Sequence, residues 1–501
     1  EVPVAILEKG RTVGAHLLSG AVVNPRSLRL LFPGMRADEM PFLAPVEGEA
    51  VYYLTPKRAI RLPTPPTMMN HGNYVASLSQ VGRWLAEKAE ELGVMLVPET
   101  AATRLLESGG RVVGVRTGDK GRGKDGEELG NFEPGADVTA KATILAEGTL
   151  GHLAATAVER FGLVTQPQRW ALGVKEVWEV SRPLERIIHT MGWPLRGGRK
   201  YREFGGSFIY PMGDGMVAIG LVVGLDYRDA SVSVHDLLQE LKTHVLVRGI
   251  LEGGHRVAWG AKTIPEGGVQ AVPSSLHFPG GVITGDAAGL VNVPALKGVH
   301  YAMYSGMLAA EATLAAVRPG STAWTPGALD GYDRSLRDSF VWKEMQRVRN
   351  MRPAFKHGFL VGSAIAAGAT ASYGHLPPGD APSEDDAGVP LFVGDRASTY
   401  PEPDGSLTFD KLSSVYLSGN RSRDDAPDHI RIQHEVPREV AEAWCRMCPA
   451  QVYEILPGGS THGNVQVQVT ASNCVQCGAI TAKGGRLTPP EGGSGPEYTL
   501  L

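Results

Sequence analysis

Four cysteines near the C-terminus carry the pattern with the most chemical content. They are all the cysteines of the chain, and they form two Cys-x-x-Cys pairs, Cys445/Cys448 and Cys474/Cys477. Each pair places two thiolates on one tight turn, and two pairs complete a site with four sulfur ligands. The spacing leaves a structural zinc ribbon and an iron–sulfur cluster as alternatives. Pro449 directly after Cys448 favours the cluster, because ferredoxin-type ligand runs end in Cys-Pro.

A second group of residues has the features of a flavin site. Glu8 ends the apolar run 4–7, and an acidic residue in this place hydrogen-bonds the adenosine ribose of a bound dinucleotide, although it can equally be a surface charge. Residues 283–289 read as a strand that runs into Gly285-Asp286 before a helix. The glycines there let the backbone approach a cofactor, whereas the alternative is a tight strand–helix turn. Together these segments predict bound FAD.

The glycine-rich phosphate loop of such a site does not precede Glu8. Its G-x-G-x-x-G motif places backbone N–H groups and a helix N-terminus against the phosphates. The chain begins at Glu1 in an apolar strand and leaves no room for that motif. We therefore expect that sequence is missing upstream and that the chain as given binds FAD weakly.

The elements that must position these groups form an α/β region followed by a sheet-rich one. Residues 1–160 alternate short apolar strands with helical stretches, including a helix expected over 81–93. Residues 166–265 read as extended, half-buried segments. A helix of small residues is expected over 302–317, and the Pro/Asp/Gly-rich segment 380–404 is expected to connect domains. The 501 residues are too many for one core, so we expect two or three domains.

Composition narrows the classes of function. The hydrophobic fraction of 43% and the charged fraction of 20% are those of an ordinary folded protein. A net charge of -4 without a basic patch argues against a nucleic-acid partner. The chain has no apolar run of about 18 residues, so no membrane-spanning helix is predicted. Four cysteines in 501 residues argue against a disulfide scaffold and fit a reducing compartment.

With these residues in hand, the chain resembles the electron-transfer flavoprotein–ubiquinone oxidoreductase family over nearly its whole length. The strings that carry the resemblance follow one another along the chain: residues 14–20 (GAHLLSG), 205–210 (GGSFIY), 220–227 (GLVVGLDY), 266–268 (EGG), 292–298 (NVPALKG), 342–344 (WKE), 349–353 (RNMRP), 409–414 (FDKLSS), 448–454 (CPAQVYE), 473–477 (NCVQC) and 490–496 (PEGGSGP). So many long strings in one order leave little room for coincidence.

The resemblance implies a fold that combines α/β and α+β parts. An N-terminally truncated FAD domain of the two-dinucleotide-binding type is expected to carry an inserted sheet-based quinone domain and a C-terminal ferredoxin-like iron–sulfur module. The implied boundaries are 1–165 and 266–350 for the FAD domain, 166–265 for the quinone domain, 351–440 for a membrane-contacting and connecting region, and 441–501 for the iron–sulfur domain.

The resemblance also implies an activity and its site. Such an enzyme oxidises reduced electron-transfer flavoprotein and passes electrons through a [4Fe–4S] cluster and FAD to ubiquinone or menaquinone, without an acid–base catalytic residue. FAD is expected to contact Glu8, Gly285, Asp286, Gly289, Asn292 and Gly298. The quinone head group is expected near Gly205, Gly206, Gly267 and Gly268.

One departure from the family concerns the cluster ligands. The family pattern is Cys-Pro-Ala followed by Cys-x-x-Cys-x-x-Cys, and Cys448, Cys474 and Cys477 match it. The fourth position is Ile480, which cannot bind iron. Cys445, which the usual pattern lacks, is expected to supply the missing thiolate. The alternatives are a three-iron cluster or a fourth ligand that is not cysteine.

The family is monotopic, which implies peripheral membrane contact here. The mildly apolar segment 355–369 follows Arg347, Arg349 and Arg352 and has Lys356 at its start. A basic approach to a short apolar run suits a segment that dips into one leaflet, while the alternative is a buried Ala-rich helix. The expected location is the inner face of a bacterial cytoplasmic membrane, or the mitochondrial inner membrane in a eukaryote.

Two other readings of the whole chain remain. One keeps the flavin but changes the reaction, as in FixC-like or geranylgeranyl-reductase-like flavoenzymes that reduce a lipid double bond. The other is a binding protein, with a zinc ribbon on a degenerate flavin fold. The tail strings count against the first, because those relatives mostly lack a fused Cys-Pro-Ala tail.

Overall fold

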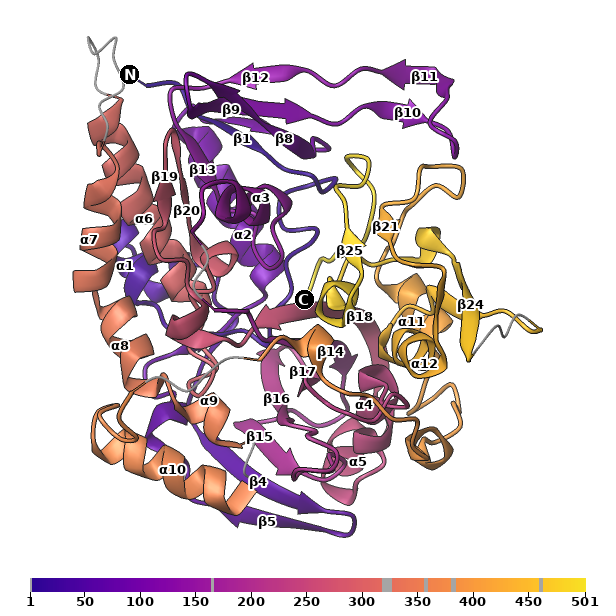
Figure 1. The fold of residues 1–501 in the computed structure, drawn as a ribbon. Coiled ribbons are helices and arrows are strands. Elements are labelled where there is room, and N and C mark those ends of the chain that lie inside the picture. The colour runs from indigo at the N-terminus through magenta and orange to yellow at the C-terminus, as the bar shows by residue number, and fades with distance from the viewer. Residues whose placement is uncertain (1, 164–165, 318–326, 356–358, 380–383, 459–462) are drawn as a thin grey trace.

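The computed structural model describes residues 2–163, 166–317, 327–355, 359–379, 384–458 and 463–501 (Figure 1). The N-terminal part contains two small sheets with parallel pairing. In the first, β1 (Ala5–Leu7) pairs with β7 (Met95–Val97). In the second, β13 (Thr143–Leu145) pairs in parallel with β20 (Gly281–Ile283), which pairs antiparallel with β19 (His277–Phe278).

Helices cover these sheets and supply most of their core. The apolar faces of β13, β19 and β20 pack with helices α3, α6, α7 and α8, around residues such as Phe278, Ile283 and Tyr332. The helices of this part are α1 (Arg26–Leu31), α2 (Leu78–Glu91), α3 (His152–Arg160), α6 (Val299–Ala316), α7 (Asp330–Asp338) and α8 (Phe340–Val348). Ser77 caps α2 by accepting a hydrogen bond from the N–H of Gln80, so the helix begins after it.

Two further small sheets and a hairpin complete the N-terminal part. The strands are β2 (Val22–Val23), β3 (Ala44–Pro45) and β6 (Tyr74–Val75) in one sheet, and β8 (Ala102–Ser108), β9 (Arg111–Thr117) and β12 (Asp137–Thr139) in the other. Within the polar, glycine-rich segment 118–137, β10 (Lys120–Arg122) and β11 (Glu128–Glu133) form a hairpin. Figure 1 shows this hairpin at the top, extending toward the C-terminal part.

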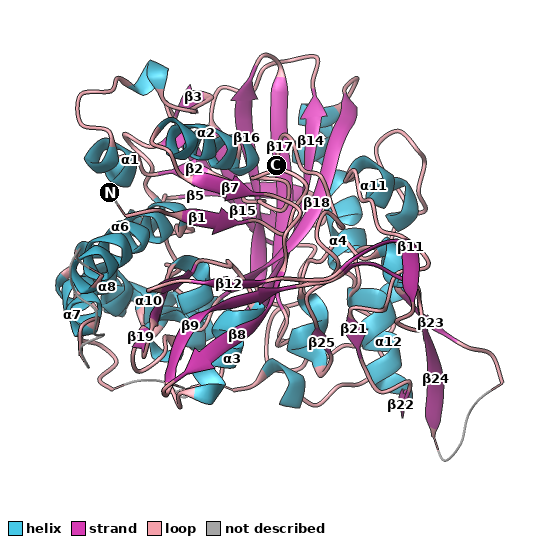
Figure 2. Cartoon of the chain, turned by 90° about the horizontal axis from the view of Figure 1, so that it is seen from above, coloured by secondary structure: helices cyan, strands magenta, loops and turns pink. Residues whose placement is uncertain are grey.

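A seven-stranded sheet forms the middle of the molecule. Its order is β18-β14-β17-β16-β15-β4-β5, and the pairs are antiparallel except β15–β4 (Figure 2). The strands are β4 (Glu49–Thr55), β5 (Arg58–Leu62), β14 (Trp170–Glu179), β15 (Ile187–Gly192), β16 (Gly205–Gly213), β17 (Met216–Gly224) and β18 (His255–Pro265). β14 and β17 each have a neighbouring strand on both sides, and nearly all their residues are buried. Two of the strands, β4 and β5, come from the segment expected to belong to the FAD domain.

The C-terminal part packs on one face of this sheet. Its elements are α11 (Lys411–Leu417), β21 (Ile430–Arg431), β22 (Glu435–Pro437), α12 (Arg438–Met447), β23 (Tyr453–Ile455), β24 (Asn464–Val469) and β25 (Arg486–Leu487). One apolar core joins them to α4 (Val234–Lys242), α5 (Val245–Leu251) and the sheet, through Trp178, Trp259 and Trp444. The C-terminal part and the seven-stranded sheet therefore share one hydrophobic core.

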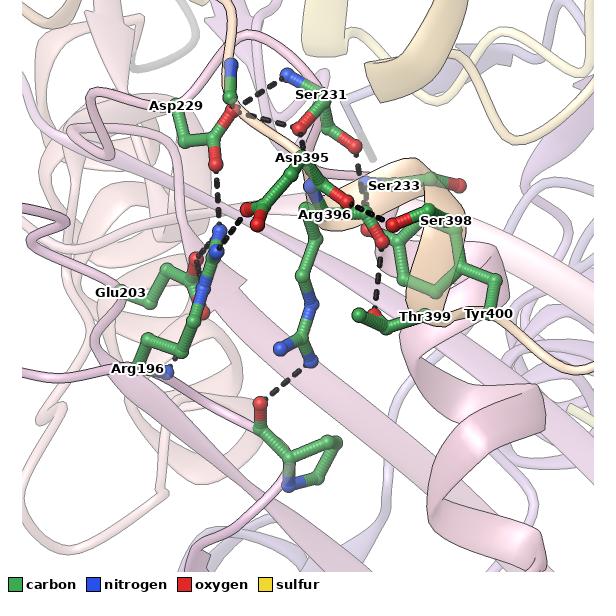
Figure 3. Close-up of polar contacts among 12 residues, drawn as sticks. Arg196, Glu203, Asp229, Ser231, Ser233, Asp395, Arg396, Ser398, Thr399 and Tyr400 are labelled. Carbon is green, nitrogen blue, oxygen red and sulfur yellow. Dashed lines mark hydrogen bonds and ion pairs between the residues drawn. The ribbon is translucent and has the colours of Figure 1, made fainter.

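A buried polar network fastens the connecting segment to the sheet domain (Figure 3). Arg196 pairs with Glu203 at 2.7 Å and with Asp229 at 2.6 Å. The backbone N–H of Arg396 donates to the hydroxyl of Ser231 at 3.1 Å, and Asp229 accepts from that same hydroxyl. The bond between Arg396 and Ser231 holds the connecting segment against the residues just before α4, so the chain is fixed there before it enters the C-terminal part.

Two helices follow α8 at the lower end of the molecule in Figure 1. They are α9 (Met351–Ala354) and α10 (Phe359–Ala371), and the β4–β5 hairpin lies at the same end. Among the described residues, no helix has both the length and the apolar character needed to span a membrane.

Candidate redox site

The four thiols lie in two places, at the C-terminal end of α12 and in the short segment between two 3-10 turns. Cys445 is in the last turn of α12, and Cys448 is the residue that ends that helix. Cys474 and Cys477 lie between two 3-10 turns, η8 (Ala471–Asn473) and η9 (Ala479–Lys483). No disulfide joins the cysteines.

Backbone N–H groups are directed at two of the sulfur atoms. The N–H of Val452 donates to Sγ of Cys448 at 3.5 Å, and the N–H of Gln476 donates to Sγ of Cys474 at 3.3 Å. Gln451 and Gln476 have φ of 51° and 52°, a conformation that turns successive N–H groups toward an anion. Such donors set the potential of iron–sulfur sites, so these loops fit a cluster.

Burial and the negative charges of neighbouring thiolates raise the pKa values of the thiols. Burial, and then the charge of Cys477, raise the pKa of Cys474, and burial raises the pKa of Cys445 to about 11. Tyr453 lies among all four cysteines: burial and then the charges of the four thiolates raise its pKa. Metal binding must therefore remove protons that the apoprotein retains. Among the described residues, no group of three or more His, Cys, Asp or Glu side chains is placed to hold a single metal ion.

Position 480 and Cys445 differ in their surroundings. Ile480 is 4% exposed and packs in the core, where its side chain meets the backbone at Gly485. Cys445 is half-buried, and the charges that act on its pKa belong to Glu442, Lys411, Cys448 and Arg446. Cys445 thus adjoins Cys448, as the predicted ligand exchange requires, and its role as the fourth ligand stays a prediction.

The predicted flavin residues after β20 lie together. A 3-10 turn, η4 (Gly285–Ala288), follows the strand, and Gly285 has φ of 65°, which only glycine adopts without strain. Its N–H donates to the hydroxyl of Ser305 on α6 at 3.0 Å. Asp286 is half-buried, and burial raises its pKa to about 6. Gly289 ends the turn with φ of 74°.

The loop from Asn292 to Gly298 folds back toward Asp286 in the η4 turn. Asn292 and Lys297 exchange two backbone hydrogen bonds, of 2.8 and 3.1 Å, which close the loop. A Cβ at Gly298 would lie 3.6 Å from Oδ1 of Asp286. The loop therefore lies against the turn, with Gly298 next to the Asp286 carboxylate, and the small glycine leaves room there for a cofactor.

Glu8 ends β1 as predicted. Its N–H donates to the carbonyl of Val97, and its Oε1 accepts from the N–H of Gly10 at 2.6 Å. Burial lowers the pKa of Lys262, while the charges of Glu8 and Asp286, one from each predicted flavin segment, both act to raise it. Glu147, two residues after β13, has a carboxylate that accepts from the N–H groups of Leu153 and Ala154 at the start of α3.

The predicted quinone residues lie at one end of the seven-stranded sheet. A Cβ at Gly205 would lie 1.9 Å from the carbonyl oxygen of Val222, so sheet packing itself requires this glycine. A Cβ at Gly206 would lie 2.5 Å from the carbonyl oxygen of Thr190. Gly267 and Gly268 follow the end of β18, and Gly268, with φ of 64°, has open space at its Cβ position.

Two residues connect these segments: Arg352, which the sequence placed at a membrane surface instead, and Gln168, which sequence reasoning missed. The guanidinium of Arg352 lies 4.0 Å from the ring centroid of Phe204, next to Gly205, and pairs with Glu266, next to Gly267, at 2.8 Å. Gln168 accepts from the N–H of Gly267 at 2.6 Å, and its amide nitrogen lies 2.8 Å from the Cβ position of Gly289. Gln168 thus touches both the flavin turn and the quinone segment. No spacing in the sequence indicates either contact.

The expected basic approach to α10 needs one correction. Arg352 is 5% exposed and also pairs with Asp226, so it does not face a lipid head group. The cause is the pair of carboxylates at the end of the sheet, which a buried arginine neutralises. Arg347 is exposed, as expected, whereas Lys356 lies outside the described residues.

Two family models match separate parts of the chain. The model "ETF-QO, ubiquinone-binding" matches residues 170–264, which are β14 to β18 of the seven-stranded sheet and the segments between them. The model "Electron transfer flavoprotein-ubiquinone oxidoreductase, 4Fe-4S" matches residues 405–499, which hold all four cysteines.

Solved structures with a similar fold are flavoenzymes. A geranylgeranyl bacteriochlorophyll reductase-like protein of Thermoplasma acidophilum has a TM-score of 0.56 at 17% identity, over 75% of this chain and 86% of its own. The flavin-dependent brominase Bmp2 has a TM-score of 0.51 at 16% identity, over 75% and 87%. At these identities the likeness concerns the fold alone, and the predicted fold class is confirmed.

Curated relatives match along the whole chain. The mitochondrial electron transfer flavoprotein-ubiquinone oxidoreductase of Arabidopsis thaliana is 40% identical over 100% of this chain and 80% of its own length. The human protein of that name is 38% identical over 99% and 84%. A probable electron transfer flavoprotein-ubiquinone oxidoreductase of Acinetobacter baylyi is 37% identical over 99% and 93%. The chain therefore belongs to the electron transfer flavoprotein-ubiquinone oxidoreductase family.

Proposed function

We propose that the chain accepts electrons from reduced electron-transfer flavoprotein and delivers them to a membrane quinone, either ubiquinone or menaquinone. The carrying observation is that Thr263 of β18 hydrogen-bonds the carbonyl of Cys477. This contact joins the sheet matched by the ubiquinone-binding family model to the loop matched by the 4Fe-4S model. FAD and a [4Fe–4S] cluster, bound at the flavin and cysteine segments described above, would supply one- and two-electron transfer.

The roles of the chain's own residues follow from their places. Cys445, Cys448, Cys474 and Cys477 are proposed as the cluster ligands. Glu8, Gly285, Asp286, Gly289, Asn292 and Gly298 are proposed to hold FAD. Gly205, Gly206, Gly267 and Gly268 are proposed to border the quinone head group, with Arg352 and Gln168 fixing the two segments relative to the flavin turn. The domain boundaries expected from the sequence are retained as part of this proposal.

The proposed location is a membrane surface, and none of the helices in the described ranges could span the bilayer. Val361 of α10, Tyr373 and Leu376 are apolar or aromatic side chains that are each more than half exposed, and they lie close together in the sequence. An exposed apolar helix beside the quinone end of the sheet suits insertion into one leaflet, since a quinone with an isoprenoid tail arrives from the lipid. The contact would be monotopic, on the inner face of a bacterial cytoplasmic membrane or in the mitochondrial inner membrane.

The test uses the purified full-length chain with its cluster reconstituted. Absorbance and EPR spectra are expected to contain flavin bands and a reducible cluster signal. Mixing with reduced electron-transfer flavoprotein and a short-chain quinone is then expected to oxidise the first and reduce the second. Zinc without iron would contradict the proposal. Reduction of an isoprenoid double bond without quinone turnover would instead favour the geranylgeranyl-reductase-like alternative, whose fold the chain shares.

A further inference from the structure

Two lysines from distant parts of the chain bind the same residue of the cysteine loop. Nζ of Lys9, two residues after β1, donates to Oε1 of Gln476 at 2.9 Å. Nζ of Lys262, on β18, donates to the carbonyl oxygen of Gln476 at 3.3 Å. Gln476 stands between Cys474 and Cys477, and both lysines are partly buried.

The charges around Lys262 come from both predicted cofactor sites. Cys477 and Cys474 of the cluster loop, and Glu8 and Asp286 of the flavin site, favour its charged form against the effect of burial, which lowers its pKa. Charges in a partly desolvated place interact much more strongly than in water. The ammonium group of Lys262 therefore interacts electrostatically with charged groups of both sites.

The charges that act on Lys9 likewise come from both the flavin side and the cysteine loop. Burial, and then the charge of Lys262, lower its pKa to about 8, while Glu8, Glu147 and Cys474 act in the opposite direction. His16, which also lies here, is kept neutral, since burial and then the two lysines lower its pKa to about 2. The positive charge at this junction is thus that of the lysines, with carboxylates on the flavin side and thiols on the other.

The two lysines also stabilise the backbone conformation of Gln476. Its φ of 52° is a strained conformation for a residue with a side chain. In this conformation its N–H points at Sγ of Cys474. Lys9 holds the side chain and Lys262 the carbonyl, so both stabilise the turn that directs this N–H at the sulfur.

A site with four thiolates is anionic with either zinc or iron–sulfur bound, and a cluster gains one more negative charge when it is reduced. A nearby positive charge stabilises the reduced form more than the oxidised one. We propose that Lys9 and Lys262 are positioning residues that hold Gln476 between the two cofactor sites and raise the reduction potential of the cluster. The inference rests on the proposed function and deepens it.

The test is an EPR-monitored redox titration of the holoenzyme at fixed pH. Lys262→Met and Lys9→Met are each expected to shift the reduction equilibrium of the cluster at least tenfold toward the oxidised form, which is about 59 mV for a one-electron couple. Lys262→Arg, which keeps the charge, is expected to stay within a few-fold of the wild type. Lys262→Gln, which keeps an N–H donor without the charge, is expected to shift like Lys262→Met, and it replaces that variant if Lys262→Met does not assemble the cluster.

Lys483 offers a matched control. It is a buried lysine in the same C-terminal part, but the charges that act on it belong to aspartates, with no cysteine among them. Lys483→Met is therefore expected to leave the cluster potential unchanged. Equal potentials in the wild type and both Lys262→Gln and Lys9→Met would overturn the proposal, as would an equal shift in Lys262→Arg. The titration needs no substrate, so its failure is distinguishable from a failure of turnover with electron-transfer flavoprotein and quinone.

Discussion

Thr263 donates both its backbone N–H and its hydroxyl to the carbonyl oxygen of Cys477, at 2.9 and 2.8 Å. The two residues lie on different parts of the fold. Thr263 is the third residue from the end of β18, and Cys477 lies in the cysteine loop before η9. The double contact fixes that loop on the strand, while the neighbouring Lys262 binds the residue before Cys477. The cluster loop is therefore positioned by the central sheet and not by the C-terminal part alone.

Thr263→Val tests this contact. The substitution keeps the shape and the backbone bond but removes the hydroxyl donor, so we expect a loss of about 0.5–1.5 kcal/mol in the free energy of unfolding. Urea denaturation of the variant and the wild type measures it. Thr263→Ser, which keeps the hydroxyl, is the control and is expected to lose less. A Val variant as stable as the wild type would mean that the backbone bond is sufficient.

The fourth cluster ligand can be tested by exchanging two positions. If Cys445 replaces the family's ligand at position 480, Cys445→Ser loses the four-iron signal in EPR and the iron content falls. Adding Ile480→Cys to that variant is expected to restore the cluster, because it returns the sulfur to the family position. Cys448→Ser serves as the positive control for ligand loss. A Cys445→Ser variant with its complete four-iron cluster would refute the assignment.

Asp286 is expected to contribute to FAD binding. Asp286→Ala removes the polar group between Gly285 and the Asn292–Gly298 loop, and we expect at least a tenfold weaker affinity for FAD. Asp286→Asn keeps a hydrogen-bonding group and is expected to lose less. Fluorescence titration of the apoprotein with FAD measures both, and Asp338→Ala, at an exposed position on α7, is the control. An unchanged affinity in Asp286→Ala would exclude this residue from the site.

The stability of the FAD part is expected to depend on pH through His277. Hydrogen bonding to Asp333 raises the pKa of this half-buried imidazole above its ordinary value. A raised pKa means that the folded state binds the proton more tightly, so the stabilisation is fully present below the unfolded pKa of about 6.5 and is lost as the pH rises through the folded pKa. We therefore expect the difference in melting temperature between the wild type and His277→Gln to shrink from pH 6 to pH 9.

His375, which is exposed, provides the control for this pH series. His375→Gln is expected to melt in parallel with the wild type at every pH. A difference between the wild type and His277→Gln that stays constant across the series would contradict the linkage.

Membrane contact by α10 predicts a charge effect on vesicle binding. Val361 is 52% exposed, and Val361→Glu would place a carboxylate where an apolar side chain is proposed to enter the lipid. We expect a several-fold loss of co-sedimentation with anionic phospholipid vesicles. Leu92→Glu is a matched control, since Leu92 is 84% exposed but follows α2 in the N-terminal part. Equal losses in both variants would mean that α10 is not the contact.

The sequence by itself determined the cofactor classes and the family, because those depend on local patterns. Two Cys-x-x-Cys pairs, one of them followed by Pro449, predict a sulfur-ligand site from four nearby residues. A strand that runs into Gly285-Asp286 predicts a cofactor turn in the same way, and the strand and the turn are both found. Such patterns can be recognised in the sequence because backbone conformation and ligand type depend on residues only a few positions apart.

Only the tertiary structure decided how these patterns meet. Lys9 and Gln476 are 467 positions apart and yet share a hydrogen bond, and Gln168 touches both Gly267 and the Gly289 position. Arg352, expected at a membrane surface from its neighbours in sequence, is instead drawn into the protein by Asp226 and Glu266. Contacts of this kind depend on which strands pair and which faces pack, and a burial or ion-pair preference seen at one position does not say which distant partner will satisfy it.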